Sequence, residues 1–309
     1  MKDLWCPPKG SSEDAGLFIL RAVISGGGYY KVLEYAAADL RDRIIQMEEM
    51  SKRVRVSILN MIYQSKSPHI GPSFSIVEIL IALYFDAMNI SPHHYWDSQR
   101  DRFILSKGHA CPALYAVLAE RGFIDSDVIK KFAINDGLLE QHPKRDLSRG
   151  IEVSTGSLGH GLSISVGMAL TGRVDCNPFN IYILLGDGEL NEGSVWEAIM
   201  FAGHHCLNNI IAIVDYNKMQ ALGFTKDIID LEPLAEKWKC FNWSVQQING
   251  HNFEEIINAL NSLSSDKPNC IILDTVKGKG VSFMENELLW HYRCPDEGEY
   301  YKALQELEA

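Results

Sequence analysis

The 309-residue chain has few of the features that direct a protein to nucleic acid, to a membrane or to an oxidising compartment. It carries 29 Lys and Arg against 40 Asp and Glu, so no basic excess can offset the phosphate repulsion of nucleic acid. No apolar run reaches the roughly 18 residues of a membrane span, and the start of the chain lacks the apolar core of a signal peptide. The seven cysteines include no Cys-x-x-Cys pair, which favours free thiols. We therefore predict a cytoplasmic protein that binds neither nucleic acid nor membrane.

What the chain does contain is 46% hydrophobic residues, ample for one large globular domain. Short apolar runs of the kind that form buried strands alternate with segments of helical spacing, which predicts an α/β fold with a mainly parallel sheet flanked by helices. Residues 1–38 are expected to form an N-terminal extension of unknown role, and residues 39–309 the domain. Strands are expected at 102–105, 180–185, 209–214, 243–248 and 269–275, and helices at about 36–64, 76–88, 112–120, 162–170, 227–238 and 253–263.

The stretch from Gly186 to Met219 organises these elements. Asp187 directly follows one predicted buried strand, and Asn217 follows the next. Because parallel strands of a βαβ unit end at the same edge of the sheet, the two side chains can meet there. A carboxylate, an amide oxygen and a backbone carbonyl suit a hard divalent cation that also binds phosphate, and Gly188 leaves room for a diphosphate. Gly-Asp-Gly alone is also typical of an ordinary strand-turn-helix, but that interpretation gives no reason for oxygen ligands at both strand ends.

Residues 186–193, Gly-Asp-Gly-Glu-Leu-Asn-Glu-Gly, followed by Asp-Tyr-Asn-Lys at 215–218, resemble the thiamine diphosphate motif in the form that transketolases carry. The resemblance covers roughly residues 40–295. It implies a three-layer thiamine diphosphate-binding fold and the cofactor thiamine diphosphate. It also implies Mg²⁺ or Ca²⁺ held by Asp187, Asn217 and the carbonyl of Met219.

Further polar segments follow the other predicted strands in the family's order. Taken alone, each has an ordinary interpretation as a solvated turn, a helix cap or a glycine-rich loop. The resemblance implies that histidines contact substrate and exchange protons, that lysines and glycine backbone contact the cofactor, and that one glutamate meets an acid of the partner. The implied catalytic residues are His69, His109, His142, His291 and Glu192, and the implied cofactor-binding residues are Lys107, Gly156, Leu158, Gly188, Asn217 and Lys277. Pro68, Pro72 and His160 depart from the family's pattern, and His160 is assigned no role.

The chain ends at Ala309, soon after the last matching motif. Transketolases need a second domain that binds the aminopyrimidine ring and supplies a glutamate to it. The resemblance therefore implies the amino-terminal subunit of a split transketolase, active in an α2β2 heterotetramer with a separate C-terminal pyrimidine-binding subunit. Such an enzyme would transfer a two-carbon ketol unit from a ketose to an aldehyde, with sugars or sugar phosphates as substrates.

Two alternatives stay open from the sequence. One is another thiamine diphosphate enzyme: a deoxyxylulose phosphate synthase, a 2-oxoacid dehydrogenase component, or an enzyme that transfers two carbons to a carrier-bound acceptor. Glu192 and the Trp290-His291 pair argue against the synthase. The other is a degenerate subunit without catalysis, against which the retention of Asp187 and Asn217 argues.

Overall fold

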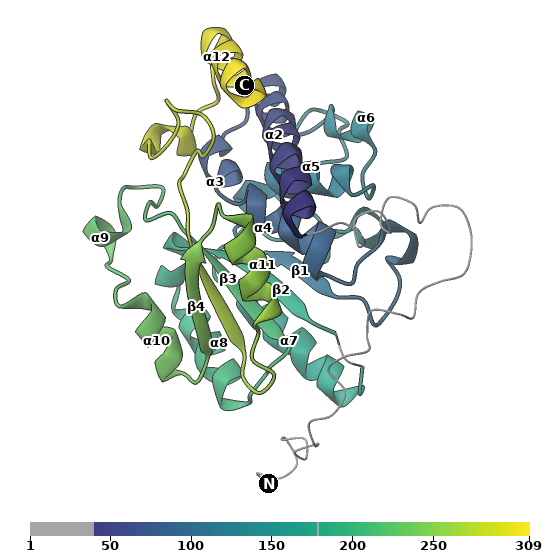
Figure 1. Ribbon diagram of the computed structural model, residues 1–309, viewed down its shortest axis with the longest axis vertical. Helices are drawn as coiled ribbons and strands as arrows, with labels where there is room; N and C mark the ends of the chain where they lie inside the picture. The colour runs from purple at the N-terminus through teal and green to yellow at the C-terminus, as the bar shows by residue number, and fades with distance from the viewer. Residues whose placement is uncertain (1–39, 178) are drawn as a thin grey trace. The chain divides into compact units, whose positions relative to one another are not determined.

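The computed structural model describes residues 40–177 and 179–309 (Figure 1). The extension expected over residues 1–38 lies outside the described residues. The chain divides between Gln46 and Met47 into two compact units. The first described helix, α2, spans Leu40–Ser65, and the fold of the second unit is built from Met47 onward.

Five strands form one sheet in the order β1-β2-β3-β5-β4, and every pairing is parallel. Apart from the outermost strand β4, the strands are almost fully buried, as expected for a parallel sheet covered on both faces. The predicted strands are confirmed to within one or two residues at each end. The strands are β1 (Arg102–Leu105), β2 (Ile181–Gly186), β3 (Ile210–Tyr216), β4 (Ser244–Asn249) and β5 (Asn269–Asp274).

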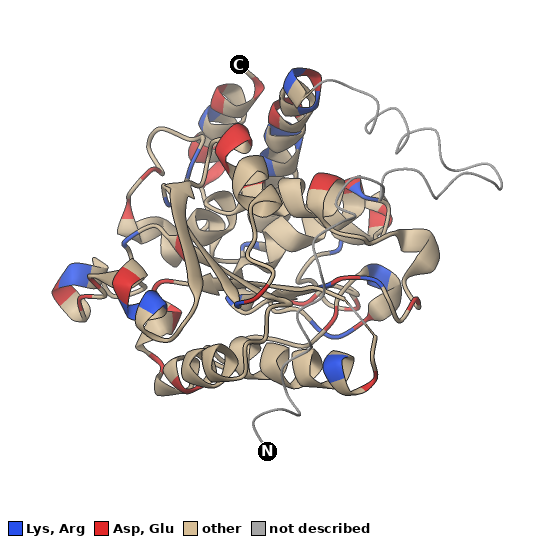
Figure 2. Cartoon of the chain, turned by 60° about the horizontal axis from the view of Figure 1, so that its bottom comes forward, with Lys and Arg blue, Asp and Glu red and all other residues tan. Residues whose placement is uncertain are grey.

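Helices connect the strands and cover both faces of the sheet (Figure 2), and charged residues lie mostly on helices and loops. The α-helices after α2 are α3 (Ile70–Phe74), α4 (Val77–Ala82), α5 (Cys111–Glu120), α6 (Ser126–Ile129), α7 (Gly161–Val174), α8 (Gly193–His204), α9 (Thr225–Ile228), α10 (Leu234–Cys240), α11 (Phe253–Asn261) and α12 (Glu297–Glu308). Short 3-10 turns lie at Pro92–His94, Gly108–Ala110, Leu147–Arg149, Gly188–Asn191 and Leu288–His291, and a π-turn at Leu83–Ala87 extends α4.

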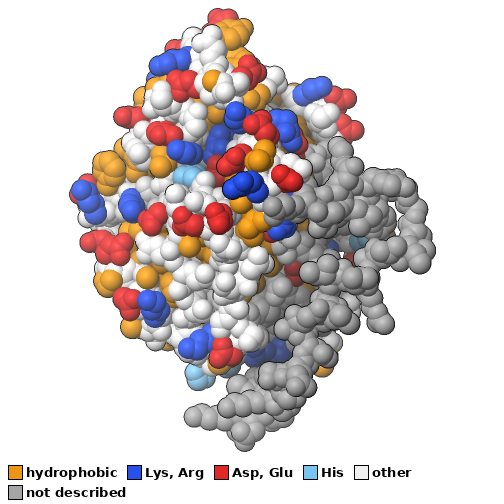
Figure 3. Space-filling model, in the orientation of Figure 1, with side chains coloured by type: hydrophobic (Ala, Val, Ile, Leu, Met, Phe, Trp, Pro, Cys, Tyr) orange, Lys and Arg blue, Asp and Glu red, His pale blue; other side chains and the backbone are white. Residues whose placement is uncertain are grey.

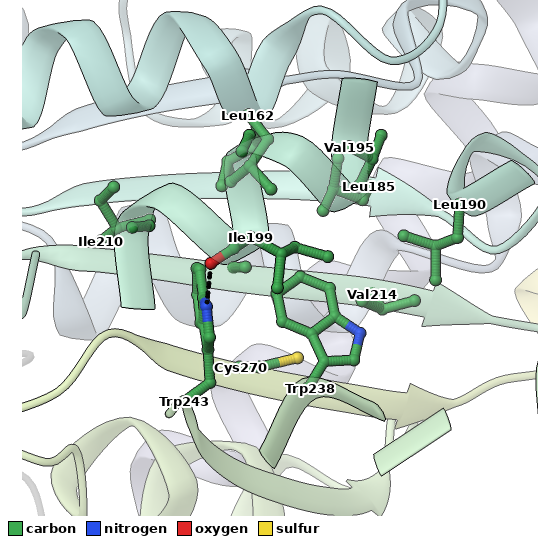
Figure 4. Close-up of a cluster of buried hydrophobic side chains, with 14 of the residues drawn as sticks. Leu162, Leu185, Leu190, Val195, Ile199, Ile210, Val214, Trp238, Trp243 and Cys270 are labelled. Carbon is green, nitrogen blue, oxygen red and sulfur yellow. Dashed lines mark hydrogen bonds between the residues drawn. The ribbon is translucent and has the colours of Figure 1, made fainter. Parts of the chain in front are cut away.

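One core layer lies between the sheet and helices α7, α8 and α10 (Figure 4). Trp238 and Trp243 fill its centre with ring centroids 4.8 Å apart. The indole N–H of Trp243 donates to the carbonyl of Ile199 at 2.9 Å, so the polar atom of this buried ring is satisfied. On the opposite face, Phe103 of β1 packs edge-on against Tyr84. The result is a helix-sheet-helix arrangement, as the apolar periodicities predict.

One expectation about helices was wrong, and one helix was missed. The single helix expected over 227–238 is two short helices, α9 and α10, separated by residues 229–233. Pro233 has no amide hydrogen to donate inside a helix, so it stands before the first residue of α10. Helix α12 was not expected, although Asp296 and Glu299 form a capping box at its start.

The described residues contain no helix that is long and apolar enough to cross a membrane. On the face drawn in Figure 3, acidic and basic side chains are interspersed among uncharged ones. The six described cysteines are free, in agreement with the prediction of free thiols.

Candidate active site

The polar residues that follow the strands gather at one edge of the sheet. Strands β1, β2 and β3 are paired in register, and Gly186 at the end of β2 lies opposite Asp215 in β3. Tyr216 of β3 lies opposite Asp274, the last residue of β5. The segments that begin after these four strands therefore start side by side. They carry Lys107, Asp187, Asn217 and Lys277.

Asp215, to which the sequence assigned no role, is the hub of this edge. It is fully buried, and its Oδ2 forms an ion pair with Lys107 and accepts hydrogen bonds from Ser75 at 2.8 Å and Asn217 at 3.0 Å. Its Oδ1 accepts from the hydroxyl of Thr275. Burial by itself would raise the pKa of Asp215, but the charge and hydrogen bond of Lys107 and the two hydroxyl bonds outweigh burial and lower the pKa. Asp215 is therefore a permanently charged anchor.

Lys107 lies beneath the edge, with its side chain 2% exposed. Besides Asp215, its ammonium donates to the carbonyl of Pro72 at 3.1 Å. A buried ammonium with an ionic partner and a carbonyl partner is well satisfied. Two of its three N–H donors are thus used inside the protein. The predicted contact of Lys107 with the cofactor stays a prediction.

Asp187 differs from Asp215 in having one unsatisfied oxygen. Its Oδ1 accepts from the amide of Gly188 at 2.7 Å, while Oδ2 is buried without a hydrogen-bond partner. Burial, followed by the charge of Asp215, raises the pKa of Asp187 to about 7. Leaving a buried carboxylate oxygen unpaired is costly, so this atom is a natural ligand for a cation.

The residues around Asp187 fit a hard divalent cation. Asn217 gives its amide hydrogen to Asp215, which turns its Oδ1 to the other side, where it accepts from the amide of Met219 at 3.1 Å. An amide oxygen has a second lone pair available for a metal. The carbonyl of Met219 accepts from the Lys277 ammonium at 3.3 Å, and a carbonyl oxygen has a second lone pair. One carboxylate and two neutral oxygens suit Mg²⁺ or Ca²⁺ with further ligands from a bound phosphate.

Three of the four predicted histidines form a cluster. The ring centroids of His69, His109 and His291 lie 5.1 to 5.4 Å apart in each pair. His69 lies at the start of α3 with φ at 77°, a left-handed conformation that is strained for this residue type. Its amide donates to the carbonyl of His291 at 3.2 Å, which ties the two segments together.

The three clustered histidines are neutral at physiological pH. Burial, followed by the charges of His142 and Lys277, lowers the pKa of His69 to about 4. Burial and the charge of Lys277 lower the pKa of His291 to about 3, and burial and Lys107 hold the pKa of His109 well below its ordinary value. A neutral imidazole carries both a donor and an acceptor, so the cluster can bind hydroxyl groups and exchange protons with them.

Lys277 lies between the histidine cluster and the Asp187 region. Its ammonium approaches Nδ1 of His291 at 2.9 Å and the carbonyls of Met219 and Gln220 at 3.3 and 3.4 Å. Because an ammonium only donates, the neutral His291 ring accepts at Nδ1 and carries its proton on Nε2. Burial, followed by the charge of Lys107, lowers the pKa of Lys277 to about 8, so it is still largely charged at neutral pH.

The remaining predicted residues lie on the loop before α7 and at the start of α8. His142 is exposed and packs on Gly156, where an added Cβ would lie 3.1 Å from the imidazole. Gly159 has φ at 84°, and a Cβ there would lie 2.7 Å from the Cβ of Glu192. Glu192 is exposed directly before α8, and Leu158 is half-buried. No ring contact among the described residues joins His142 to the three-histidine cluster, although its charge acts on the pKa of His69.

Glu189 is a second residue that sequence reasoning missed. Its carboxylate is almost fully buried and accepts from the hydroxyl of Ser106, from the amide of Gly159 at 2.9 Å and from the amide of Gly186 at 3.2 Å. It thereby joins the ends of β1 and β2 to the glycine-rich loop. The position of Glu189 in Gly-Asp-Gly-Glu could have drawn attention to it in the sequence. It could not have shown its role, because a carboxylate beside a metal motif is equally typical of a metal ligand and of a residue that anchors a loop.

Comparisons with known proteins agree with this geometry. The family described as "Transketolase, thiamine diphosphate binding domain" matches residues 46–299. An apulose-4-phosphate transketolase subunit of Phocaeicola vulgatus is 40% identical over 84% of this chain and 93% of the relative. A 6-deoxy-6-sulfo-D-fructose transketolase subunit of a Clostridium species is 43% identical over 87% of this chain and 98% of the relative.

The solved transketolase of Campylobacter jejuni has a TM-score of 0.78 and 29% identity, covering 85% of this chain and 42% of that chain. This chain thus spans about two fifths of the solved transketolases that it matches.

The fold and the site define a thiamine diphosphate-binding α/β protein. The chain belongs to the transketolase family, whose enzymes are transferases. The resemblance seen in the motifs and the predicted fold class are therefore confirmed. The roles of single residues stay predictions.

Proposed function

We propose that this chain is the diphosphate-binding subunit of a two-chain transketolase that transfers a two-carbon ketol unit from a ketose to an aldehyde. The observation that carries the proposal is the joint presence, at one sheet edge, of the oxygen set around Asp187 and the neutral cluster of His69, His109 and His291. The first suits a metal and a diphosphate, and the second suits the hydroxyls of a sugar.

In this proposal Asp187, Asn217 and the carbonyl of Met219 hold Mg²⁺ or Ca²⁺, and Gly188 leaves its backbone open to the diphosphate. Lys277 adds positive charge beside the phosphates. Gly156 and Leu158 offer backbone contacts to the aminopyrimidine, and Lys107 supports the site from beneath through Asp215.

Thiamine diphosphate, when bound, supplies the nucleophilic carbon that cleaves and forms the carbon–carbon bond. The protein's own groups then have three tasks. The neutral histidines His69, His109 and His291 donate to and accept from substrate hydroxyls and move protons during cleavage. The exposed His142 contacts the far part of the substrate. Glu192, exposed before α8, faces the partner chain and meets its acid.

The partner and substrates follow from the relatives. Both relatives named above are subunits of transketolases and are matched over nearly their whole length, which supports a separate partner chain here. We propose that this partner binds the pyrimidine and that the two chains form an α2β2 assembly. Their names specify apulose-4-phosphate and 6-deoxy-6-sulfo-D-fructose, which supports sugars that carry an anionic group, a phosphate or a sulfonate, as substrates. We place the protein in the cytoplasm, which agrees with its free cysteines.

The deciding experiment reconstitutes this chain with the product of an adjacent gene and assays ketose cleavage. We expect activity only when both chains, thiamine diphosphate and Mg²⁺ are present, and loss of activity on metal removal by a chelator. Full activity of the isolated chain would overturn the two-chain assignment. Failure of the pair to bind the cofactor in calorimetry would overturn the assignment of the site.

A further inference from the structure

Three buried side chains form a hydrogen-bonded network, called the relay below, that contacts the loop of Lys277. Arg55 of α2, Glu78 of α4 and His251, in the turn after β4, have side chains only 6 to 11% exposed. The guanidinium of Arg55 pairs with Oε1 of Glu78 at 2.7 Å, and Oε2 of Glu78 lies 3.0 Å from Nδ1 of His251. None of these residues belongs to the site proposed above.

The relay fixes the tautomer of His251. A charged carboxylate only accepts, so Nδ1 of His251 carries the proton and donates it to Glu78. Nε2 is then a lone-pair acceptor, and the amide of Val276 donates to it at 2.8 Å. The carboxylate of Glu78 keeps the proton on Nδ1 of His251 and so leaves Nε2 free to accept from Val276. Val276 directly precedes Lys277, so this hydrogen bond holds the backbone next to Lys277.

The charge of Glu78 is secured by its partners. Burial alone would raise the pKa of Glu78, but the charge of Arg55 and the hydrogen bonds from His251 and Arg55 outweigh burial and lower the pKa. The carboxylate is therefore ionised at neutral pH and cannot donate to His251.

Arg55 holds the same loop on the other side of Lys277. Its Nε donates to the carbonyl of Lys279 at 2.8 Å, while His251 takes the amide of Val276. The backbone is thus bonded to the relay both before and after Lys277. The relay therefore restrains the segment that aims the ammonium at the site.

We propose that Arg55, Glu78 and His251 are positioning residues that hold the loop of Lys277, so that its ammonium stays on Nδ1 of His291 and beside the proposed site of the diphosphate. This inference rests on the proposed function, in which Lys277 lies beside the diphosphate. It adds three residues, none of which touches the cofactor.

The sharpest test is Glu78→Gln, which keeps the shape and removes the charge. An amide that accepts from Arg55 through its oxygen must present its NH₂ group to His251. The ring must then accept at Nδ1 and carry its proton on Nε2, where it opposes the amide of Val276, which is also a donor. In the other orientation of the amide, its NH₂ group faces the guanidinium of Arg55, which is also only a donor. Either way one hydrogen bond of the relay is lost.

Glu152→Gln is the matched control. Glu152 is also a buried glutamate paired with an arginine, at 2.7 Å from Arg100, with its side chain 11% exposed. It lies near the start of β1 and has no hydrogen bond to the loop of Lys277. Both variants lose one buried charge, so a general effect on stability appears in both.

The first readout needs no activity. In the full-length chain, hydrogen-deuterium exchange of peptides that contain Val276 should accelerate on the order of tenfold in Glu78→Gln, and not in Glu152→Gln. In the reconstituted pair, thiamine diphosphate affinity or kcat should fall about 10- to 100-fold, as is typical when a group supporting a ligand is removed. Unchanged exchange at Val276 would overturn the proposed hold on the loop. Faster exchange with unchanged affinity and kcat would overturn the positioning of Lys277.

A second pair of variants keeps the test open if Glu78→Gln does not fold. His251→Phe keeps a ring but removes the acceptor, while His251→Gln retains an oxygen that can reach the amide of Val276. We expect His251→Phe to show the same faster exchange at Val276 and the same loss of cofactor affinity or kcat as Glu78→Gln. We expect His251→Gln to retain part of the exchange protection and of the turnover. Equal behaviour of the two variants would contradict the proposal. If the wild-type pair is inactive, the proposed function fails, and exchange at Val276 still decides whether the relay holds the loop.

Discussion

Asp187 and Asp215 stand at the ends of neighbouring strands, yet their surroundings act on them in opposite directions. Lys107, Ser75 and Thr275 satisfy the carboxylate of Asp215 and outweigh its burial, which lowers its pKa. Oδ2 of Asp187 has no hydrogen-bond partner, and burial, followed by the charge of Asp215, outweighs the bond from Gly188 and the charge of Lys107 and raises the pKa of Asp187 to about 7. One carboxylate is thus an internal anchor, and the other keeps an oxygen without a hydrogen-bond partner, which is the basis for our proposal that it binds a cation.

This difference predicts the behaviour of Asp187→Asn. The amide keeps the shape but removes the charge, so we expect Mg²⁺-dependent binding of thiamine diphosphate to the reconstituted pair to weaken by about 100-fold or more. The unliganded chain should be no less stable, because a poorly satisfied buried carboxylate is lost. Calorimetry with and without Mg²⁺ and thermal unfolding measure the two effects.

Asp274→Asn is the control for this prediction, since Asp274 ends β5 at the same edge but lies 41% exposed beside Lys218. We expect the control to bind cofactor as the wild type does. Equal cofactor affinity of Asp187→Asn and the wild type would contradict the assignment of Asp187 as a metal ligand.

The histidine cluster predicts a pH dependence of stability. The pKa of His109 is lowered well below the ordinary 6.5 in the folded chain, so the unfolded chain binds a proton first as the pH falls. The free energy of unfolding should therefore be fully retained above about pH 6.5 and decline below it, by up to about 1.4 kcal/mol per pH unit for this residue. His109→Gln should remove that part of the slope between about pH 6 and pH 5.

Urea unfolding of the full-length chain at several pH values measures this slope. His94→Gln is the control, because His94 lies exposed in a surface turn. A slope that is the same in His109→Gln and in the wild type would show that His109 does not lose its proton on folding.

At the scale of elements, close helix packing decides which glycines are required. Gly203 lies in the last turn of α8, and a Cβ there would lie 1.7 Å from the carbonyl oxygen of Phe241. Gly167 lies in α7, where a Cβ would meet nothing within 4 Å. Both glycines lie inside a helix. They differ because α8 packs closely against the turn before β4 at Gly203, whereas no described residue packs on Gly167.

Alanine at the two positions should therefore have opposite effects. Gly203→Ala should destabilise the chain by about 1–3 kcal/mol or more, because backbone must move. Gly167→Ala should stabilise it by about 0.5–1 kcal/mol, because glycine is a poor helix residue. Chemical unfolding of both full-length variants measures the difference. A neutral Gly203→Ala would contradict the close contact between α8 and Phe241.

At the scale of the whole molecule, most of the residues that we propose for a metal, for phosphates and for sugar hydroxyls follow strands that end at one edge of the sheet. The match to the solved Campylobacter jejuni transketolase takes up only 42% of that chain. We propose that a second chain contributes the acid for the aminopyrimidine. The exposed Glu192 beside the glycine-rich loop is the residue of this chain that we expect to meet it.

The sequence by itself determined the parallel sheet, the residues at its edge and the family. Short, β-branched apolar runs are typical of strands buried on both faces, and parallel strands end at one edge when they belong to βαβ units, so Asp187, Asn217 and Lys277 were predictable neighbours. The helix expected over 227–238 failed because a helical spacing of apolar residues does not reveal where Pro233 breaks it.

Only the tertiary structure decided which charges meet. Asp215 is held by Ser75 and Lys107, 140 and 108 residues away, and Glu78 meets His251 across 173 residues. Local pattern contains no information on such pairs, because they depend on how α2, α4 and the loops after the strands pack over the sheet. The direction of a pKa depends on these partners and on burial. For this reason the sequence, through its resemblance to the family, could name Asp187 as a metal ligand but gave no role to Asp215, whose buried partners only the tertiary structure shows.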